Sequence, residues 1–143
     1  MTFTDPHSPA WEPLLGAAWG AWERAYAPYS GFRVGAALLW TGAAGAEVVA
    51  GCNVENAAFP VALCAERTAV CAAVSRGLAV GGLRALVVVT EAAEPTPPCG
   101  ACRQVLAEFA ESLPILLVNR NGRSLCDIRE LLPRAFTGRN FST

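Results

Sequence analysis

The chain has 143 residues and a formal net charge of −1, and only 16% of its residues are charged, against about 25% in typical soluble domains. It contains no run of Lys or Arg, which argues against binding to nucleic acid polymers. No apolar stretch approaches the roughly 20 residues that span a membrane, and the first residues do not read as a signal peptide. We therefore expect a single cytoplasmic domain over residues 1–143, with part of its apolar surface covered by subunit interfaces.

The first half of the chain predicts a helix, a hairpin and a second helix. Residues 11–27 carry apolar side chains at helical spacing, which indicates an amphipathic helix. Residues 32–40 and 46–54 flank a Gly-rich turn and are typical of two paired strands. Residues 64–77 predict another helix, which ends at Gly77.

The second half continues the alternation. Residues 83–90 are almost wholly apolar, as in a strand buried on both faces. Residues 99–113 predict a third helix, residues 115–119 and 123–126 form a hairpin around an Asn-Gly turn, and Asp127 begins a last short helix. This order predicts an α/β fold, a three-layer α/β/α sandwich with a mixed sheet of about five strands.

Six cysteines in a reducing compartment indicate thiols or metal ligands rather than a disulfide framework. Cys99 and Cys102 have C-x-x-C spacing, which fits a metal site, a thioredoxin-like redox pair or coincidence. A Pro-rich loop precedes the pair, whereas a thioredoxin-like motif would directly follow an early strand. Three further cysteines lie within strand or helix patterns, which predict small buried side chains. They are Cys52, Cys71 and Cys126.

Cys64 is then the best third ligand, because the only histidine, His7, lies in an irregular N-terminal segment. Three protein ligands leave one coordination position open, which is typical of catalytic zinc. Three thiolates around Zn²⁺ leave a net negative charge. The N-termini of two helices and the side chain of Arg67 would offset that charge, although Arg67 could also be an ordinary surface residue.

Glu66 is the candidate proton carrier. A carboxyl group beside an open zinc site can move protons between water and substrate. Residues two apart on a regular helix diverge by about 200°, so Glu66 and Cys64 can converge only if Cys64 lies at the helix entry. The alternative is an exposed glutamate favoured by the helix dipole. Beside three thiolates, we favour the catalytic interpretation.

Longer motifs then point to a family. "CAE" followed by "PCGAC" resembles the C-x-E…P-C-x-x-C form of the zinc-dependent nucleoside deaminases. With "YAPYSGFRVGAALL", "GCNVENAAF" and "LLPRAF", the stretch from Tyr26 to Phe136 resembles the small homotetrameric cytidine deaminases. The resemblance implies a hydrolase that uses Zn²⁺ to convert cytidine and 2′-deoxycytidine to the uridines with release of ammonia, in pyrimidine salvage.

The resemblance also implies a role for each matching residue. Cys64, Cys99 and Cys102 would hold zinc, and Glu66 would protonate N3 of the base and assist the departure of ammonia. The matching substrate-binding residues are Asn53 and Glu55 at the ribose hydroxyls, Phe32 against the base, the backbone of Ala65 at the pyrimidine edge, and Phe136 closing the site of a neighbouring subunit.

Four of these residues have a simpler interpretation as core or turn residues when they are taken without their motifs; these are Phe32, Asn53, Glu55 and Phe136. Phe59 stands where many relatives of that family have tyrosine, so we expect it to pack rather than to make a polar contact. Two other functions stay open: a deaminase of a different aminopyrimidine, and a zinc-stabilised structural module without catalysis. The Asn53–Glu55 pair argues against the first, and Glu66 argues against the second.

Overall fold

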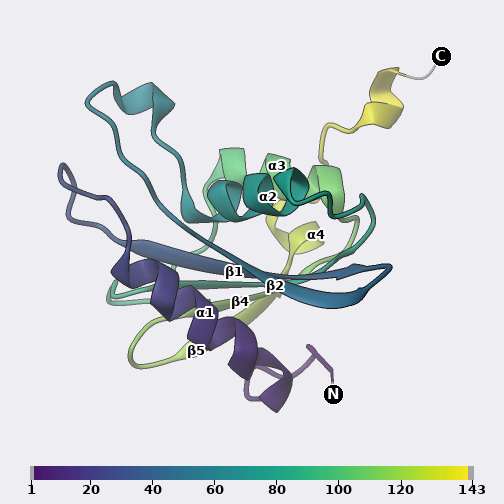
Figure 1. The fold of residues 1–143 in the computed structure, drawn as a ribbon, viewed down its shortest axis with the longest axis horizontal. Helices are drawn as coiled ribbons and strands as arrows, with labels where there is room; N and C mark the ends of the chain where they lie inside the picture. Colours follow the sequence, from purple (N-terminus) through teal and green to yellow (C-terminus); the bar gives the residue numbers. More distant parts are fainter. Residues whose placement is uncertain (1, 142–143) are drawn as a thin grey trace.

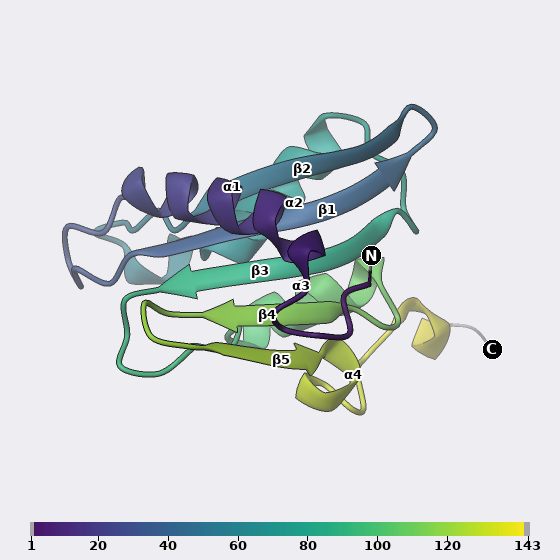
Figure 2. The ribbon, with the colours of Figure 1, turned by 90° about the horizontal axis from the view of Figure 1, so that it is seen from below.

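A five-stranded mixed sheet forms the centre of the protein, which we describe from a computed structural model over residues 2–141. The strand order is β2-β1-β3-β4-β5 (Figures 1 and 2). Only β3 and β4 run parallel, and the other neighbouring strands are antiparallel. The strands are β1 (Val34–Gly42), β2 (Gly45–Cys52), β3 (Leu83–Thr90), β4 (Pro114–Val118) and β5 (Arg123–Asp127).

Helices cover both faces of this sheet (Figure 1). α1 (Glu12–Glu23) crosses one face, while α2 (Ala65–Ser75), α3 (Gly100–Phe109) and the short α4 (Ile128–Leu131) cover the other. The predicted three-layer sandwich and its mixed sheet are therefore confirmed. Over residues 2–141, no helix is both long enough and apolar enough to cross a membrane.

Each face of the sheet has its own apolar core, because alternate side chains of the strands point to opposite sides. Under α1 the core contains Trp11 and Val87, and under α2 and α3 it contains Trp40 and Leu86. Both tryptophan rings are fully buried. The indole N–H of Trp11 donates to the carbonyl oxygen of Asp5, and that of Trp40 donates to the carbonyl oxygen of Ala79. β3 contributes to both cores, as its almost wholly apolar sequence predicts.

Two glycines allow the helices to lie very close to the sheet. A Cβ on Gly35 in β1 would collide with the backbone carbonyl of Ala18 and lie 2.8 Å from the amide nitrogen of Trp22, both in α1. A Cβ on Gly51 in β2 would collide with the amide of Ala69 and lie 2.7 Å from the carbonyl of Ala65, both in α2. Gly51 therefore sets the depth at which α2 packs.

Several boundaries differ from the sequence-based expectation. The first helix ends at Glu23 rather than near residue 27, because Tyr26 leaves the helix to form a bridge with Val54. The third helix ends at Phe109, since Ala110 is already extended on the way to β4. The prediction that Cys71 is buried is wrong: it lies on the exposed face of α2.

We expect Gly35→Ala to lower the free energy of unfolding by about 1–3 kcal/mol, because the added methyl group must push α1 away from the sheet. Gly16→Ala is the matched control, since Gly16 lies in α1 with no atom near its Cβ position, and removing a helical glycine should stabilise the protein by up to about 1 kcal/mol. Denaturant unfolding of both variants checks the pair. Equal stabilities would contradict the close-approach argument.

Candidate active site

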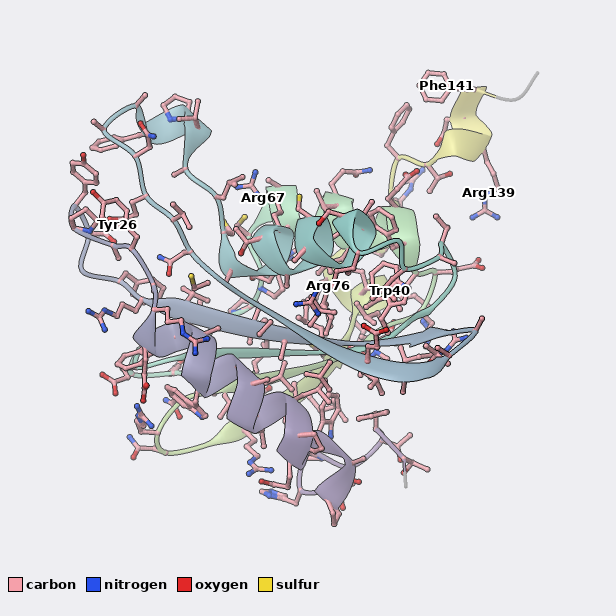
Figure 3. All side chains as sticks on the ribbon, viewed as in Figure 1. Tyr26, Trp40, Arg67, Arg76, Arg139 and Phe141 are labelled. Atoms are coloured by element: carbon pink, nitrogen blue, oxygen red, sulfur yellow. The ribbon has the colours of Figure 1, made fainter. Side chains whose placement is uncertain are left out.

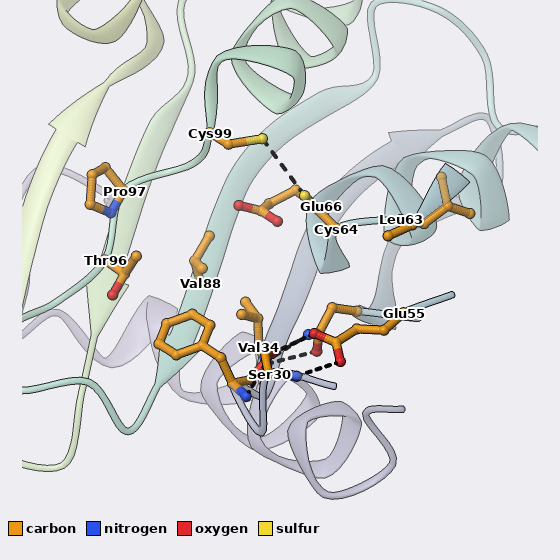
Figure 4. A pocket seen from close by; sticks show the side chains of 13 residues that line it. Ser30, Val34, Glu55, Leu63, Cys64, Glu66, Val88, Thr96, Pro97 and Cys99 are labelled. Atoms are coloured by element: carbon orange, nitrogen blue, oxygen red, sulfur yellow. Dashed lines mark hydrogen bonds between the residues drawn. The ribbon is translucent and has the colours of Figure 1, made fainter. Parts of the chain in front are cut away.

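A pocket of about 250 Å³ opens where the start of β1, the end of β2, the N-terminus of α2 and the loop before α3 meet (Figure 4). This volume lies just below the usual range for small-ligand sites, which begins at about 300 Å³. Its wall combines acidic, amide, sulfur and apolar groups. The lining residues are Ser30, Phe32, Val34, Asn53, Glu55, Ala62, Leu63, Cys64, Glu66, Val88, Thr96, Pro97 and Cys99.

Three cysteine sulfurs cluster at one end of the pocket. The Sγ atoms of Cys64, Cys99 and Cys102 all lie within 4.8 Å of one another, and those of Cys64 and Cys99 are 3.6 Å apart. All six cysteines of the chain are free thiols. Sulfurs bound to one tetrahedral zinc at about 2.3 Å would be about 3.8 Å apart, so this donor set fits a zinc ion.

The backbone at the helix entries brings these sulfurs together. Cys64 precedes the first turn of α2 with extended dihedrals (φ −76°, ψ 156°), and Cys99 precedes α3 in the same way (φ −65°, ψ 167°). Cys102 lies in the first turn of α3. Both helix N-termini therefore face the cluster, where their partial positive charge favours thiolates.

The electrostatics of the cluster favour one thiolate at Cys64. A hydrogen bond from Cys102 and the nearby guanidinium of Arg67 lower the pKa of Cys64 to about 5, although burial opposes this shift. The same hydrogen bond and burial raise the pKa of Cys102. Nη2 of Arg67 lies 3.5 Å from the Cys64 sulfur and 3.4 Å from the carbonyl oxygen of Ala62 (Figure 3 labels Arg67). A divalent cation would favour deprotonation of all three sulfurs.

Glu66 lies beside the sulfurs with only 4% of its surface exposed. Its carboxyl group points into the pocket next to Cys64 and Cys99 (Figure 4). Burial raises the pKa of Glu66, and the negative charge of Cys64 raises it further. The extended backbone of Cys64 is what lets these two side chains converge although they are two residues apart. A carboxyl group with a raised pKa can hold and release a proton near neutral pH.

Asn53 and Glu55 also line the pocket, and Glu55 lies at the end away from the sulfurs (Figure 4). Both side chains also bind protein groups. The amide of Asn53 donates to the carbonyl oxygen of Phe32 (2.7 Å) and accepts from the N–H of Val34 (2.8 Å). Glu55 accepts hydrogen bonds from Ser30 and Tyr29. An amide offers two donors and two acceptor positions and a carboxylate about four acceptor positions, so both side chains keep capacity for a ligand.

The remaining predicted site residues divide into those at the pocket and those away from it. Phe32 lies in the pocket wall with 43% of its surface exposed. Ala65 is fully buried behind the wall, as the first residue of α2. Phe136 is not part of this chain's pocket: it lies 58% exposed on the C-terminal segment and packs edge-on against Phe141.

Sequence reasoning missed several residues of the wall, including Ser30, Val88 and Thr96. Ser30 could have been found from the Ser-Gly turn in "YSGF", because serine in a turn often bonds to neighbouring groups. Val88 and Thr96 carry no comparable signal, since the first is one of many apolar residues in β3. Phe59 packs edge-on against Tyr29, yet 71% of it is exposed.

Comparison with known proteins agrees with this geometry. The family model described as "Cytidine and deoxycytidylate deaminase zinc-binding region" matches residues 11–116. A cytidine deaminase of Sporosarcina psychrophila is 47% identical over 137 residues, covering 92% of this chain and 94% of that protein. Another from Halalkalibacterium halodurans is 43% identical over 131 residues, covering 90% and 96%.

Solved structures show the same relationship. A cytidine deaminase from Burkholderia pseudomallei has a TM-score of 0.81 and 46% identity, covering 87% of this chain and 97% of the other. A cytidine deaminase from Mycobacterium tuberculosis has a TM-score of 0.71 and 43% identity, covering 90% and 98%. The family match spans most of the chain and the relatives align along nearly their whole length, so the chain belongs to the cytidine and deoxycytidylate deaminase family of zinc-binding hydrolases.

Proposed function

We propose that this enzyme hydrolyses cytidine and 2′-deoxycytidine to uridine and 2′-deoxyuridine with release of ammonia, as a cytoplasmic enzyme of pyrimidine salvage. One observation carries the proposal: the buried carboxyl group of Glu66 lies against three clustered sulfurs at one end of a pocket that Asn53 and Glu55 also line. This arrangement supports a reaction at the sulfur end and binding of the sugar by Asn53 and Glu55.

The overall reaction adds water at C4 of the base and breaks the bond from C4 to the exocyclic nitrogen. Cys64, Cys99 and Cys102 would hold a zinc ion, which would supply a nucleophile at neutral pH because zinc lowers the pKa of bound water to about 7. Glu66 would take one proton from the attacking water and deliver it to N3. It would then take the remaining proton from the hydroxyl group added at C4 and give it to the departing amine, so that the C4 carbonyl forms as ammonia leaves. Its burial and its raised pKa suit this exchange.

Other residues bind and orient the nucleoside. The free donor and acceptor positions of Asn53 and Glu55 would take the ribose hydroxyls, and the ring of Phe32 would pack against the base. The backbone N–H of Ala65 would meet the pyrimidine edge, because the first amides of a helix have no partner within it. Arg67 would offset the negative charge of the three thiolates.

We also propose that residues 1–143 act as one domain and assemble as a homotetramer in which Phe136 completes the site of a neighbouring subunit. Residues 133–141, here called the C-terminal arm, leave the body of the protein (Figures 1 and 3). Phe136 and Phe141 on this arm are 58% and 78% exposed. Exposed aromatic pairs of this kind are typical of subunit contacts.

Glu66→Gln should keep the fold and the zinc content but lower kcat for cytidine by about 10²–10⁴-fold, because an amide cannot carry the proton. Glu47→Gln is the matched control, since Glu47 is exposed in the β1–β2 hairpin. An ultraviolet assay of cytidine loss, with zinc measured on the same samples, checks both variants. Full activity in Glu66→Gln would remove Glu66 from the mechanism, and a zinc-loaded wild-type protein inert towards both nucleosides would refute the function.

Zinc content tests the ligand set. The wild-type protein should hold one zinc per chain, and Cys102→Ala should lose most of it, because two sulfurs cannot replace the three-ligand site. Cys71→Ala removes a thiol from the exposed face of α2 and should bind zinc as the wild type does. Elemental analysis after dialysis against a weak chelator gives the comparison. Equal zinc loss in both variants would contradict the assigned ligands.

Subunit mixing tests Phe136. Phe136→Ala should weaken activity because the neighbouring pocket stays open, while its own Glu66 remains intact. Co-refolding it with inactive Glu66→Gln should restore activity, since an intact Glu66 then meets an intact Phe136 from another subunit. Light scattering of each sample reports the oligomeric state. Activity that stays at the sum of the two separate variants would show that Phe136 serves only its own subunit.

A further inference from the structure

The turn before β1 is fastened to the end of β2 by a dense set of hydrogen bonds. The backbone of Tyr26 bonds to that of Asn53 at 3.0 Å and to that of Glu55 at 2.8 Å. The turn then closes through the N–H of Gly31, which donates to the carbonyl oxygen of Ala27 at 3.0 Å. Gly31 has a φ of 69°, in the left-handed region that glycine adopts without strain.

Ser30 occupies the centre of this turn and bonds in two directions. Its hydroxyl donates to Oε2 of Glu55 and accepts from the N–H of Phe32 at 3.0 Å (Figure 4). One hydroxyl thus connects the carboxylate at the sugar end of the pocket with the backbone of the residue whose ring lines its wall. On the other side of Phe32, its carbonyl oxygen accepts from the amide of Asn53.

The carboxylate of Glu55 depends on this turn for its position. Its Oε1 accepts from the amides of Tyr29 (2.9 Å) and Ser30 (3.0 Å), and its Oε2 accepts from the Ser30 hydroxyl. Within residues 2–141, Glu55 makes no ion pair. These hydrogen bonds, above all those of Ser30, lower the pKa of Glu55 and keep the side chain ionised. Without the Ser30 hydroxyl, Oε2 of Glu55 would lose this hydrogen bond, and the carboxylate would be free to rotate away from the pocket.

We propose that Ser30 is a positioning residue that holds the Glu55 carboxylate and the Phe32 backbone in the geometry that binds the nucleoside. The inference rests on the proposed function, because it takes Glu55 as the sugar-binding group and Phe32 as the base-packing group. Ser30 acts through these two residues and moves no proton in the reaction. Its loss should therefore affect substrate binding more than the chemical step.

The test compares Ser30→Ala with the wild type in steady-state kinetics on cytidine. KM should rise about tenfold with little change in kcat, because a charge-assisted hydrogen bond that orders a binding group is lost. Ser30→Thr retains the hydroxyl and should restore most of the affinity. Ser75→Ala is the matched control, since the Ser75 hydroxyl donates to the carbonyl oxygen of Ala72 within α2, and Ser75 does not line the pocket. Unchanged KM in Ser30→Ala overturns the proposal.

A double-mutant cycle separates positioning from general destabilisation. In a Glu55→Ala background, Ser30→Ala should raise KM clearly less than it does in the wild type, because one of the two groups that Ser30 positions is already gone and only the Phe32 backbone remains. An equal effect in both backgrounds overturns the proposal. Thermal unfolding and zinc content show whether Ser30→Ala folds. If it does not, Ser30→Cys replaces it, because a thiol is a weaker donor of similar size and should give an intermediate KM. A wild-type KM in Ser30→Cys overturns the proposal.

The outcomes also distinguish this inference from the function on which it rests. A wild-type protein without activity on cytidine would refute the proposed function. An unchanged KM in Glu55→Ala would refute the sugar-binding role of Glu55. An active wild type in which Glu55→Ala raises KM and Ser30→Ala does not would refute the role of Ser30 alone.

Discussion

The active site depends on two helices that begin at the same point in space. Cys64 and Cys99 are separated by 34 intervening residues in the chain, yet their sulfurs lie 3.6 Å apart because α2 and α3 start side by side on one face of the sheet. Gly51 allows α2 to pack against β2 at close range, and the Thr68 hydroxyl fixes this contact by donating to the carbonyl oxygen of Cys52 at 2.7 Å. The sulfur cluster, the burial of Glu66 and the reach of Arg67 all follow from that placement.

The end of the pocket at Phe32 and Asn53 depends on a different constraint, the register of the β1–β2 hairpin. Gly35 pairs with Cys52, so the segment that enters β1 runs beside the segment that leaves β2. Phe32 and Asn53 are thereby brought within hydrogen-bonding distance, although 20 residues separate them in the chain. A register shift by one residue would turn these side chains to the other face of the sheet. Sheet pairing therefore determines this end of the pocket as firmly as helix placement determines the end that holds the sulfurs.

The two ends of the pocket present different chemical groups and therefore favour different ligands. Around the sulfurs, helix N-termini and a guanidinium group provide positive charge for anionic ligands. At the other end, two backbone amides and one hydroxyl group donate to the carboxylate of Glu55; these neutral partners leave its negative charge unpaired and able to accept further hydrogen bonds. The C-terminal arm belongs to neither end, because hydrogen bonds from Arg103 and Gln104 of α3 fasten the chain at Leu131 and Phe136, outside the pocket.

The sequence by itself determined the type and order of the elements and the three ligand candidates, because periodicity, turn residues and motif spacing are local properties. It set only the condition that Cys64 must lie at its helix entry to converge with Glu66, and the structure supplied the extended backbone that meets this condition. It could not determine where α1 and α3 end, since Tyr26 leaves its helix for a bridge with Val54 and Ala110 extends towards β4. Nor could it identify Ser30, whose importance arises from contact with Glu55, 25 residues later. Helix ends and hydrogen-bond partners were decided only by the tertiary structure, because each depends on which distant segment packs alongside.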